Sequence, residues 1–467
     1  MQPSSARHQT PHTARRGGSL LERGHEALQR NEWADAARLL AKGTQGLSCT
    51  AIDWLALAVA RWKTADMDGC VDASSRALAL DPVNVTARMV LTQALITLHR
   101  FDEAIDAFQS APEDTPRDHN FHVNHGIALL RSGRAKEAVG PLMEALAQKM
   151  DFDLAYTTLG TAFKNLKLYE EAVECFRTAA ALDPDNVLAH AFVAHMDQFA
   201  CRWEQFDSNR TNLLGAIRRA SLNRADQGAE TTPFALVALP HDPADFLAAT
   251  RLEAQRIQRD VTPFQPRDLH KNGDRRLRIG YLSGDFHQHA TAMLITEALE
   301  CRNTDQFEVT LYCHSPEDHS SARARLRKAC EHFVEVHHLT PKQIAERVRS
   351  DGIDIFVDLK GYTNGNRFSS FAYRPAPIQV TWLGFPGTTG TSFVDYIIGD
   401  PVVTPLEHAA HYSEKVAQMG VCYQPNDRYR PKPKPTSRSE VGLPGSAFVY
   451  ACFNQCYKIT PEVFGVW

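Results

Sequence analysis

A repeat of 34 residues in the first half of the chain constrains the fold more than any other feature. "ALALDPVNV" places Pro82, and "AALDPDNV" places Pro184 at a distance of 102 residues, or three periods of 34. Pro116 lies 34 residues after Pro82, although Met150 occupies the next slot. A fixed period of this length predicts a unit of two antiparallel helices that must stack on its neighbours to bury a continuous core.

The best-formed unit spans residues 153–186. It carries Gly160 in its first half and Ala172, Phe176 and Ala179 in its second half. Small residues let the two helices approach closely, and large apolar residues fill the seam between neighbouring units. The same register predicts further units, which are 17–50, 51–84, 85–118 and 119–152, with another near 187. We therefore expect a tetratricopeptide superhelix over 17–220, after a disordered tail at 1–16, with a concave face that binds extended peptides or partner proteins.

The second half of the chain alternates between β-rich runs and segments with helical periodicity. After a linker region at 221–275, six short runs have strand character, namely 276–282, 307–314, 332–339, 353–359, 378–385 and 394–400. Helical segments such as "PKQIAERVRSDG" separate several of these runs, with Gly352 expected as a helix C-cap. The alternation predicts an α/β lobe at 276–440, built on a mainly parallel, doubly wound sheet with helices on both faces.

Unusual loops follow three of the predicted strands. They are "SGDFHQHAT", "KGYTNGN" and "PGTTGT". In sheets of this kind ligands bind beyond the carboxyl ends of the strands. Gly384, Gly387 and Gly390 allow the backbone to approach a ligand, although turns need glycine in any case. Three such loops at one edge of the sheet predict a binding site there.

A last strand is expected at 447–453, "AFVYACF". Gln455 and Lys458 follow it, where the next helix should begin. A lysine beside a helix N-terminus suits a pyrophosphate group, because the helix end is electropositive.

Four segments together resemble the O-linked N-acetylglucosamine transferase and SPINDLY-like proteins of glycosyltransferase family 41. These segments are "RLRIGYLSGDFHQHATAMLI", "DGIDIFVDLKGYTNGN", "RPAPIQVTWLGFPGTTGTSFVDYIIGD" and "FNQCYK". The resemblance implies a GT-B fold, in which two Rossmann-like lobes hold a nucleotide sugar between them. It also implies inverting transfer of N-acetylglucosamine from UDP-GlcNAc to Ser or Thr hydroxyls of proteins. No metal or other cofactor is implied, and SPINDLY-type members use GDP-fucose instead.

The resemblance places the active-site histidine of the family on His289. Asp358 and Lys360 fall in a loop near the acceptor, and we take Asp358 as a second candidate for the catalytic group and Lys360 as substrate-binding. Gln455 and Lys458 correspond to the residues that contact the nucleotide and the diphosphate.

The loop that lines the sugar end of the donor pocket in the family falls on four residues of this chain, which are Gly384, Pro386, Gly387 and Thr388. Ala290 stands where many members have proline. Segment 445–467 resembles only the start of the second, nucleotide-binding lobe, so we expect this polypeptide to be truncated and to have little or no activity by itself.

Other interpretations of these residues remain open. His289 could accept the proton of the acceptor hydroxyl or could position the acceptor. Asp285, His287 and His289 share one face of an extended segment, so a metal site is conceivable there. The whole chain could also be a repeat scaffold with a degenerate catalytic lobe, or a transferase that uses another nucleotide sugar such as GDP-fucose.

The bulk composition excludes some classes of function. A net charge of −4 and a pI near 6.6 give no attraction to nucleic acid or to anionic membranes, and no apolar run has the length of a membrane span. The ten cysteines are scattered without a C-x-x-C pair, as expected for reduced thiols of a cytoplasmic protein. A homodimer formed through the repeats is a further expectation from the resemblance.

Overall fold

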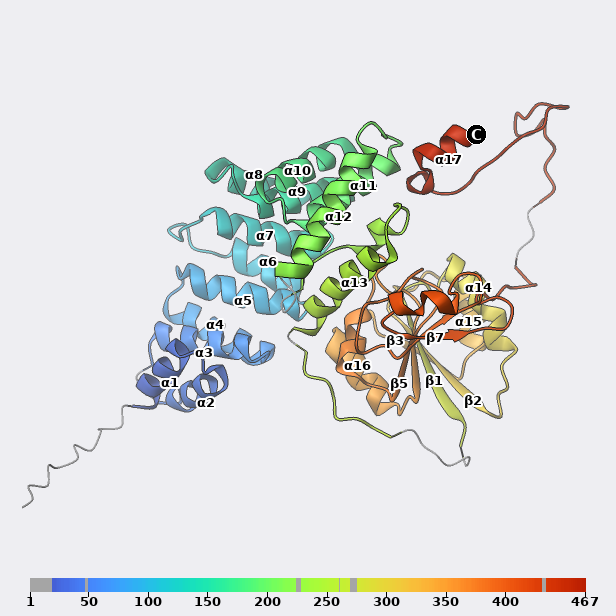
Figure 1. The fold of residues 1–467 in the computed structure, drawn as a ribbon. Coiled ribbons are helices and arrows are strands. Elements are labelled where there is room, and N and C mark those ends of the chain that lie inside the picture. Colours follow the sequence, from blue (N-terminus) through green and yellow to red (C-terminus); the bar gives the residue numbers. More distant parts are fainter. Residues whose placement is uncertain (1–18, 47–48, 224–227, 260, 269–274, 431–433) are drawn as a thin grey trace, which may run out of the picture. The chain divides into compact units, whose positions relative to one another are not determined.

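The computed structural model describes residues 19–46, 49–223, 228–259, 261–268, 275–430 and 434–467 (Figure 1). The predicted tail at 1–16 lies outside these residues. The chain divides into two compact units, Met1–Met150 and Asp151–Trp467, and each is described by itself. Within the described ranges, no helix is both long enough and apolar enough to cross a membrane.

The described part of the first unit consists of helix pairs in the predicted registers. These helices are α1 (Leu20–Gln29), α2 (Trp33–Gly43), α3 (Ala51–Lys63), α4 (Met67–Leu80), α5 (Val85–Thr97), α6 (Phe101–Gln109), α7 (His119–Arg131) and α8 (Ala135–Gln148). Within a pair, a small residue on the first helix receives a large one from the second. A Cβ at Gly24 would come within 2.7 Å of Leu40, and one at Gly126 within 2.6 Å of Leu142. The close approach predicted from small residues is therefore confirmed.

The pairs continue in the second unit. They are α9 (Asp153–Asn165) with α10 (Tyr169–Leu182), and α11 (Val187–Phe199) with α12 (Phe206–Asn223). Gly160 faces the buried ring of Phe176, where a Cβ would lie 2.9 Å from the ring. Gly160 and Phe176 are 16 residues apart, as are Gly24 and Leu40. The same contact thus recurs in both units.

The turn between the two helices of a pair contains one residue in the left-handed conformation. These residues have φ between +53° and +83° and recur every 34 positions: Asn31, Ala65, His99, Gly133, Lys167 and Cys201. Only Gly133 escapes the steric penalty that a side chain incurs there. The period of the sequence is therefore also a period of backbone geometry.

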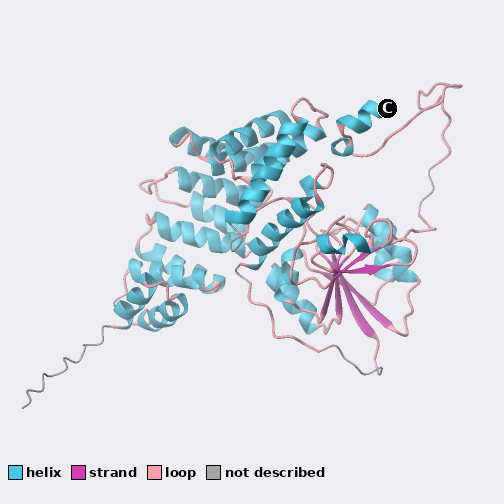
Figure 2. Ribbon diagram, viewed as in Figure 1, coloured by secondary structure: helices cyan, strands magenta, loops and turns pink. Residues whose placement is uncertain are grey.

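The remainder of the second unit comprises an α/β lobe and a segment, 456–467, that packs through Tyr457 on α11. Its helical elements are η1 (Pro233–Leu236), α13 (Pro243–Gln258), α14 (Ala290–Glu300), α15 (Ser321–Lys328), α16 (Pro341–Ser350), η2 (Phe368–Tyr373), η3 (Leu406–His411), η4 (Cys456–Lys458) and α17 (Pro461–Val466). Its strands are β1 (Leu277–Ser283), β2 (Phe307–Cys313), β3 (His332–Glu335), β4 (Ile355–Asp358), β5 (Ile378–Thr381), β6 (Tyr396–Gly399) and β7 (Lys415–Gln418). Figure 2 shows these strands as one twisted sheet between helices.

All pairings in this sheet are parallel, and the strand order is β3-β2-β1-β4-β5-β6-β7. Helices α14 and α15 cover one face and α16 the other (Figure 1). Successive strand residues point to opposite faces: Val357 packs with α14 and α15, whereas Phe356 packs with α16 and η2. The predicted doubly wound sheet is confirmed, and Gly352, with φ +69°, follows the end of α16 as expected.

Two details of the strand prediction were wrong. The sequence analysis missed β7, a four-residue edge strand. It also predicted a strand at 447–453, where the structure has no strand. A β-rich run needs a neighbouring strand to satisfy its backbone groups, and this run has none: Phe448, Tyr450 and Phe453 are 80%, 90% and 99% exposed.

Candidate functional site

The site lies where the order of the strands reverses. From β1 the chain runs outward through β2 to β3, and then returns to the other side of β1 to form β4. Leu282 of β1 pairs with Asp358 of β4. Because the strands are parallel, the loops that follow β1 and β4 emerge side by side at one edge, which is the ligand-binding position of doubly wound sheets.

An ion pair joins these two loops. Lys360 Nζ donates to Asp285 Oδ1 at 2.8 Å, and each side chain is only 11% exposed. The two residues are 75 positions apart in the sequence, and the switch in strand order brings them together. The pair fixes the loop after β1 to the loop after β4.

Asp358 organises the loop that carries Lys360. Its carboxylate accepts the backbone N–H groups of Lys360 and Gly361 at 3.1 and 2.6 Å, and the hydroxyl of Thr381 at 3.2 Å. Burial raises the pKa of Asp358 to about 6, and the residue is 2% exposed. With its oxygens turned to the loop backbone and to Thr381, Asp358 holds Lys360 in place and presents no carboxylate to a substrate.

His289 ends the loop after β1 and caps helix α14. Its Nδ1 accepts the backbone N–H of Thr291 at 3.2 Å and lies 3.8 Å from Asp285 Oδ2. Burial lowers the pKa of His289, against the opposing effect of Asp285, so the ring is neutral at pH 7. Because Nδ1 accepts a hydrogen bond, the proton of the neutral ring is on Nε2. The side chain is 43% exposed, so His289 offers a hydrogen-bond donor at the edge of the sheet.

His287 plays a different part from His289. Its Nδ1 lies 4.0 Å from Asp318, in the loop that precedes α15, while Asp285 is bonded to Lys360. Asp285 lies near His289 but is bonded to Lys360, and His287 lies near Asp318 instead. In the part of the chain that the structure describes, no group of three or more His, Cys, Asp or Glu residues is arranged to hold a metal ion.

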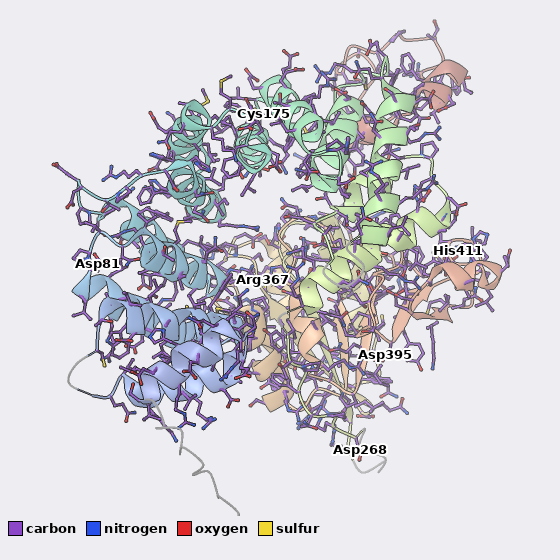
Figure 3. All side chains as sticks on the ribbon, turned by 60° about the vertical axis from the view of Figure 1, so that its left-hand side comes forward. Asp81, Cys175, Asp268, Arg367, Asp395 and His411 are labelled. Carbon is purple, nitrogen blue, oxygen red and sulfur yellow. The ribbon has the colours of Figure 1, made fainter. Side chains whose placement is uncertain are left out.

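His314 is a site residue that the sequence analysis missed. It follows β2, next to β1, and its ring packs on Gly284, where a Cβ would lie 2.6 Å from Cε1. Burial lowers the pKa of His314 to about 3, helped by the positive charges of Arg367 (labelled in Figure 3) and Lys360. Its buried Nε2 has no hydrogen-bond partner among the described residues. The available signal was its place at the end of "FEVTLYCH", at the same sheet edge.

The loop after β5 packs tightly on the loop after β4. A Cβ at Gly384 would lie 1.9 Å from the carbonyl oxygen of Leu359, so only glycine fits there. Gly361, with φ +51°, faces Phe385 at a distance that excludes a Cβ. Leu383 also has a positive φ, of 70°, which is unfavourable for a bulky side chain. The structure thus brings Gly384 to the Lys360 loop.

The other residues predicted in the loop after β5 differ in exposure. Pro386 is exposed. Gly387 lies against the ring of Phe246, and Thr388 is 3% exposed and donates to Glu414 at 2.7 Å. Of the three, Pro386 is the most open to a ligand, Gly387 is half-buried and Thr388 is buried.

Gln455 and Lys458 lie outside this constellation. Both are exposed, and the segment that carries them packs through Tyr457 on His195 of α11, with ring centroids 4.9 Å apart. Among the described residues, no hydrogen bond or ion pair joins the side chain of Gln455 or Lys458 to the loops after β1 or β4.

Parts of this chain match models of known protein families. Residues 247–430 match the model of glycosyl transferase family 41, and tetratricopeptide repeat models match residues 55–119, 93–152 and 154–186. Residues 247–430 are thus similar to glycosyl transferase family 41, and parts of the first half are similar to tetratricopeptide repeats. The site described above lies within residues 247–430.

Several curated proteins are similar to this chain. The chain is 37% identical over 289 residues to the probable UDP-N-acetylglucosamine--peptide N-acetylglucosaminyltransferase SEC of Arabidopsis thaliana, covering 58% of this chain and 29% of that protein. It is 34% identical to the Caenorhabditis elegans UDP-N-acetylglucosamine--peptide N-acetylglucosaminyltransferase, and the match covers 48% of this chain and 20% of that protein. It is 32% identical to the probable UDP-N-acetylglucosamine--peptide N-acetylglucosaminyltransferase SPINDLY of Arabidopsis thaliana, and the match covers 42% of this chain and 22% of that protein. The chain thus spans less than a third of the length of each of these curated relatives.

A solved structure also resembles this chain. A mutant O-GlcNAc transferase of Thermobaculum terrenum aligns with a TM-score of 0.54 and 28% identity, covering 75% of this chain and 65% of that one. The similarity extends over the helical repeats and the parallel sheet together, because it covers more of the chain than either region alone contains.

Proposed function

We propose that this protein transfers N-acetylglucosamine from UDP-GlcNAc to Ser or Thr hydroxyls of other proteins, with inversion at the sugar. The observation that carries the proposal is the meeting of His289, Asp285 and Lys360 at the switch point of a sheet inside the family 41 domain. The relatives named as peptide N-acetylglucosaminyltransferases support the donor and the acceptor class.

His289 is proposed to position the acceptor rather than to remove its proton. The neutral ring carries its hydrogen on Nε2, since Nδ1 accepts from Thr291. A donor at Nε2 can hold the acceptor oxygen or an oxygen of the sugar donor, but it cannot accept a proton. The proton of the attacking hydroxyl then passes to another group, for which the departing phosphate of the donor is suited because charge develops on it as the bond to the sugar breaks.

Asp358 is proposed to act through the loop that carries Lys360. Asp358 orients the loop backbone, and Lys360 brings a positive charge to within 2.8 Å of Asp285 at the rim of the site. Asp358 is thus a positioning residue, not a group that contacts substrate. Pro386 and the backbone around Gly384 remain the proposed wall of the sugar pocket.

The donor diphosphate is proposed to bind Gln455 and Lys458, whose type and order match the family motif. No metal ion is needed in this scheme, because lysine and backbone N–H groups can neutralise a diphosphate. The repeats are proposed to bind acceptor proteins along their concave face. A cytoplasmic location and a homodimer remain predictions of the same scheme.

The proposal is tested by incorporation of labelled sugar into acceptor proteins. The protein, purified from expression of its gene, is incubated with a cell extract and with either UDP-GlcNAc or GDP-fucose. We expect label on Ser and Thr with UDP-GlcNAc and none with GDP-fucose. Label from GDP-fucose alone would replace the proposed donor.

A scaffold function is the second candidate. The observation in its favour is that Gln455 and Lys458 lie at α11 and make no bond to the loops of the sheet. This candidate predicts that the repeats capture partner proteins while neither donor gives incorporation. Transfer with either donor contradicts it.

A further inference from the structure

Two cysteines that are far apart in the sequence lie close together in the second unit. Cys201 lies in the turn between α11 and α12, and Cys456 begins η4. The thiol of Cys456 lies close enough to raise the pKa of Cys201, although the residues are 255 positions apart. Both cysteines are free and exposed to solvent.

Aromatic contacts on both sides hold this pair in place. The ring of Tyr457 packs on His195 at 4.9 Å and on Phe234 at 6.0 Å between centroids. Phe464 of α17, six positions beyond the end of η4, packs on Trp203 at 5.1 Å between ring centroids, and Trp203 lies two positions after Cys201. Aromatic pairs of this kind contribute about 0.5–1.5 kcal/mol each beyond the area they bury. The meeting of the two thiols therefore follows from a docked segment rather than from a single loose contact.

We propose that Cys201 and Cys456 form a reversible disulfide that attaches residues 456–467 to helix α11. The oxidant is a low-molecular-weight disulfide of the glutathione class. One protein thiolate attacks a sulfur of this disulfide, which forms a mixed disulfide and releases one small thiol. The second protein thiolate then attacks the mixed disulfide and releases the other small thiol. The two protons of the protein thiols end on the two released thiols, so the exchange is balanced.

The surroundings suit a bond that forms and breaks. Both sulfurs are open to small reagents, whereas structural disulfides are usually buried and resist reduction. Burial and the neighbouring Cys456 raise the pKa of Cys201, so the thiol is protonated in the resting state and is a slow nucleophile. The other exposed cysteine nearby in the sequence, Cys452, makes its described contact with Asn454 instead.

The bond would also act on residues of the proposed donor site. Gln455 and Lys458 flank Cys456, so the oxidised form ties both covalently to the end of α11, where aromatic contacts hold the segment in the reduced form. This consequence rests on the proposed function, whereas formation of the disulfide does not.

The test is mass spectrometry of the full chain after treatment with oxidised glutathione in mildly alkaline buffer. Trypsin cuts after Arg177, Arg202, Arg438 and Lys458, so the disulfide joins peptide 178–202 to peptide 439–458. We expect this cross-linked pair to appear, the free thiol count to fall by two, and dithiothreitol to reverse both changes.

Matched variants distinguish the bond from a general effect on folding. Cys201→Gly removes the thiol at a position with φ +53°, which glycine prefers, so the turn should keep or gain stability. It should abolish the cross-link, and Cys452→Ser should leave it intact. A disulfide between Cys452 and Cys456, or glutathione adducts without the cross-linked pair, would overturn the proposal while leaving the proposed function untouched.

Discussion

The helical repeats and the parallel sheet are built by different rules. In the repeats, the decisive contacts join residues close in the sequence, such as Gly160 and Phe176, only 16 positions apart. In the sheet, Asp285 meets Lys360 over 75 positions, because β4 returns to the side of β1. The first kind of contact is visible as a period in the sequence. The second kind exists only once the strand order is known.

Glycine illustrates the same difference. The turns of the repeats need a left-handed backbone, and Asn31, Ala65, His99, Lys167 and Cys201 supply it at a modest cost. The loops of the sheet need empty space, because another main chain occupies the position of a Cβ at Gly384. A repeat turn therefore tolerates most residues, whereas the sheet loop admits one.

The largest expected effect is that of Gly384→Ala. The new Cβ would meet the carbonyl oxygen of Leu359 at 1.9 Å, so one of two packed loops must move. We expect a loss of about 4 kcal/mol in the free energy of unfolding measured by urea titration, above the usual range for overpacking. Gly420→Ala is the matched control, since nothing lies within 4 Å of its Cβ. Equal effects of the two substitutions would show that the loops are not packed as described.

Lys360→Met should have the next largest effect on the free energy of unfolding. It leaves the carboxylate of Asp285 enclosed without its partner, which costs about 3 kcal/mol of stability. Arg76→Met in the repeats breaks a pair with Asp72 in which both side chains are more than half exposed. That loss should stay below about 0.5 kcal/mol. If the two substitutions lower the free energy of unfolding equally, the enclosed pair of Lys360 and Asp285 contributes no more to stability than an exposed ion pair.

The third prediction concerns the pH dependence of stability and compares a histidine of the sheet with a histidine of the repeats. Burial lowers the pKa of His314 in the sheet to about 3 and that of His125 in the repeats to about 4. In the unfolded chain these histidines take up a proton near pH 6.5, whereas in the folded protein they stay neutral until the pH is much lower. As the pH falls below about 6.5, protonation therefore stabilises the unfolded chain, and the free energy of unfolding decreases.

Between pH 8 and pH 5, each histidine should cost about 2 kcal/mol. His314→Leu and His125→Leu should each reduce the change in the free energy of unfolding between these two pH values by that amount, as measured by urea titration. A pH profile that neither substitution changes would mean that these rings take up protons freely in the folded state.

The smallest effect is expected in a repeat turn. Gly133 has φ +83° and nothing within 4 Å of its Cβ, so Gly133→Ala tests backbone conformation alone and should cost about 1 kcal/mol. Gly215→Ala, inside helix α12, should gain about 1 kcal/mol, because alanine favours a helix. Thermal unfolding followed by circular dichroism can resolve the two opposite signs. Shifts of the same sign would contradict the left-handed turn.

These contrasts explain what the sequence could predict. The helix registers, six of the seven strands and the edge at which His289 and Lys360 lie followed from spacing and from apolar runs. The short edge strand β7 did not, because four residues, one exposed and three half-buried, carry little pattern. The run at 447–453 had the composition of a strand but lacks a partner, and composition cannot supply one. The pairing of Asp285 with Lys360 and the packing of His314 on Gly284 depend on which strands are neighbours, which a single sequence does not state.

The central claim is that His289 serves the reaction and not only the fold. The direct measurement compares His289→Asn with the unchanged protein, both purified from expression of the gene, in sugar transfer and in stability. Asparagine is a good helix cap and can replace the Nδ1 contact to Thr291, but it lacks Nε2. We predict that transfer from UDP-GlcNAc falls at least about 100-fold while the free energy of unfolding changes by less than about 0.5 kcal/mol. Undiminished transfer by His289→Asn would contradict the account.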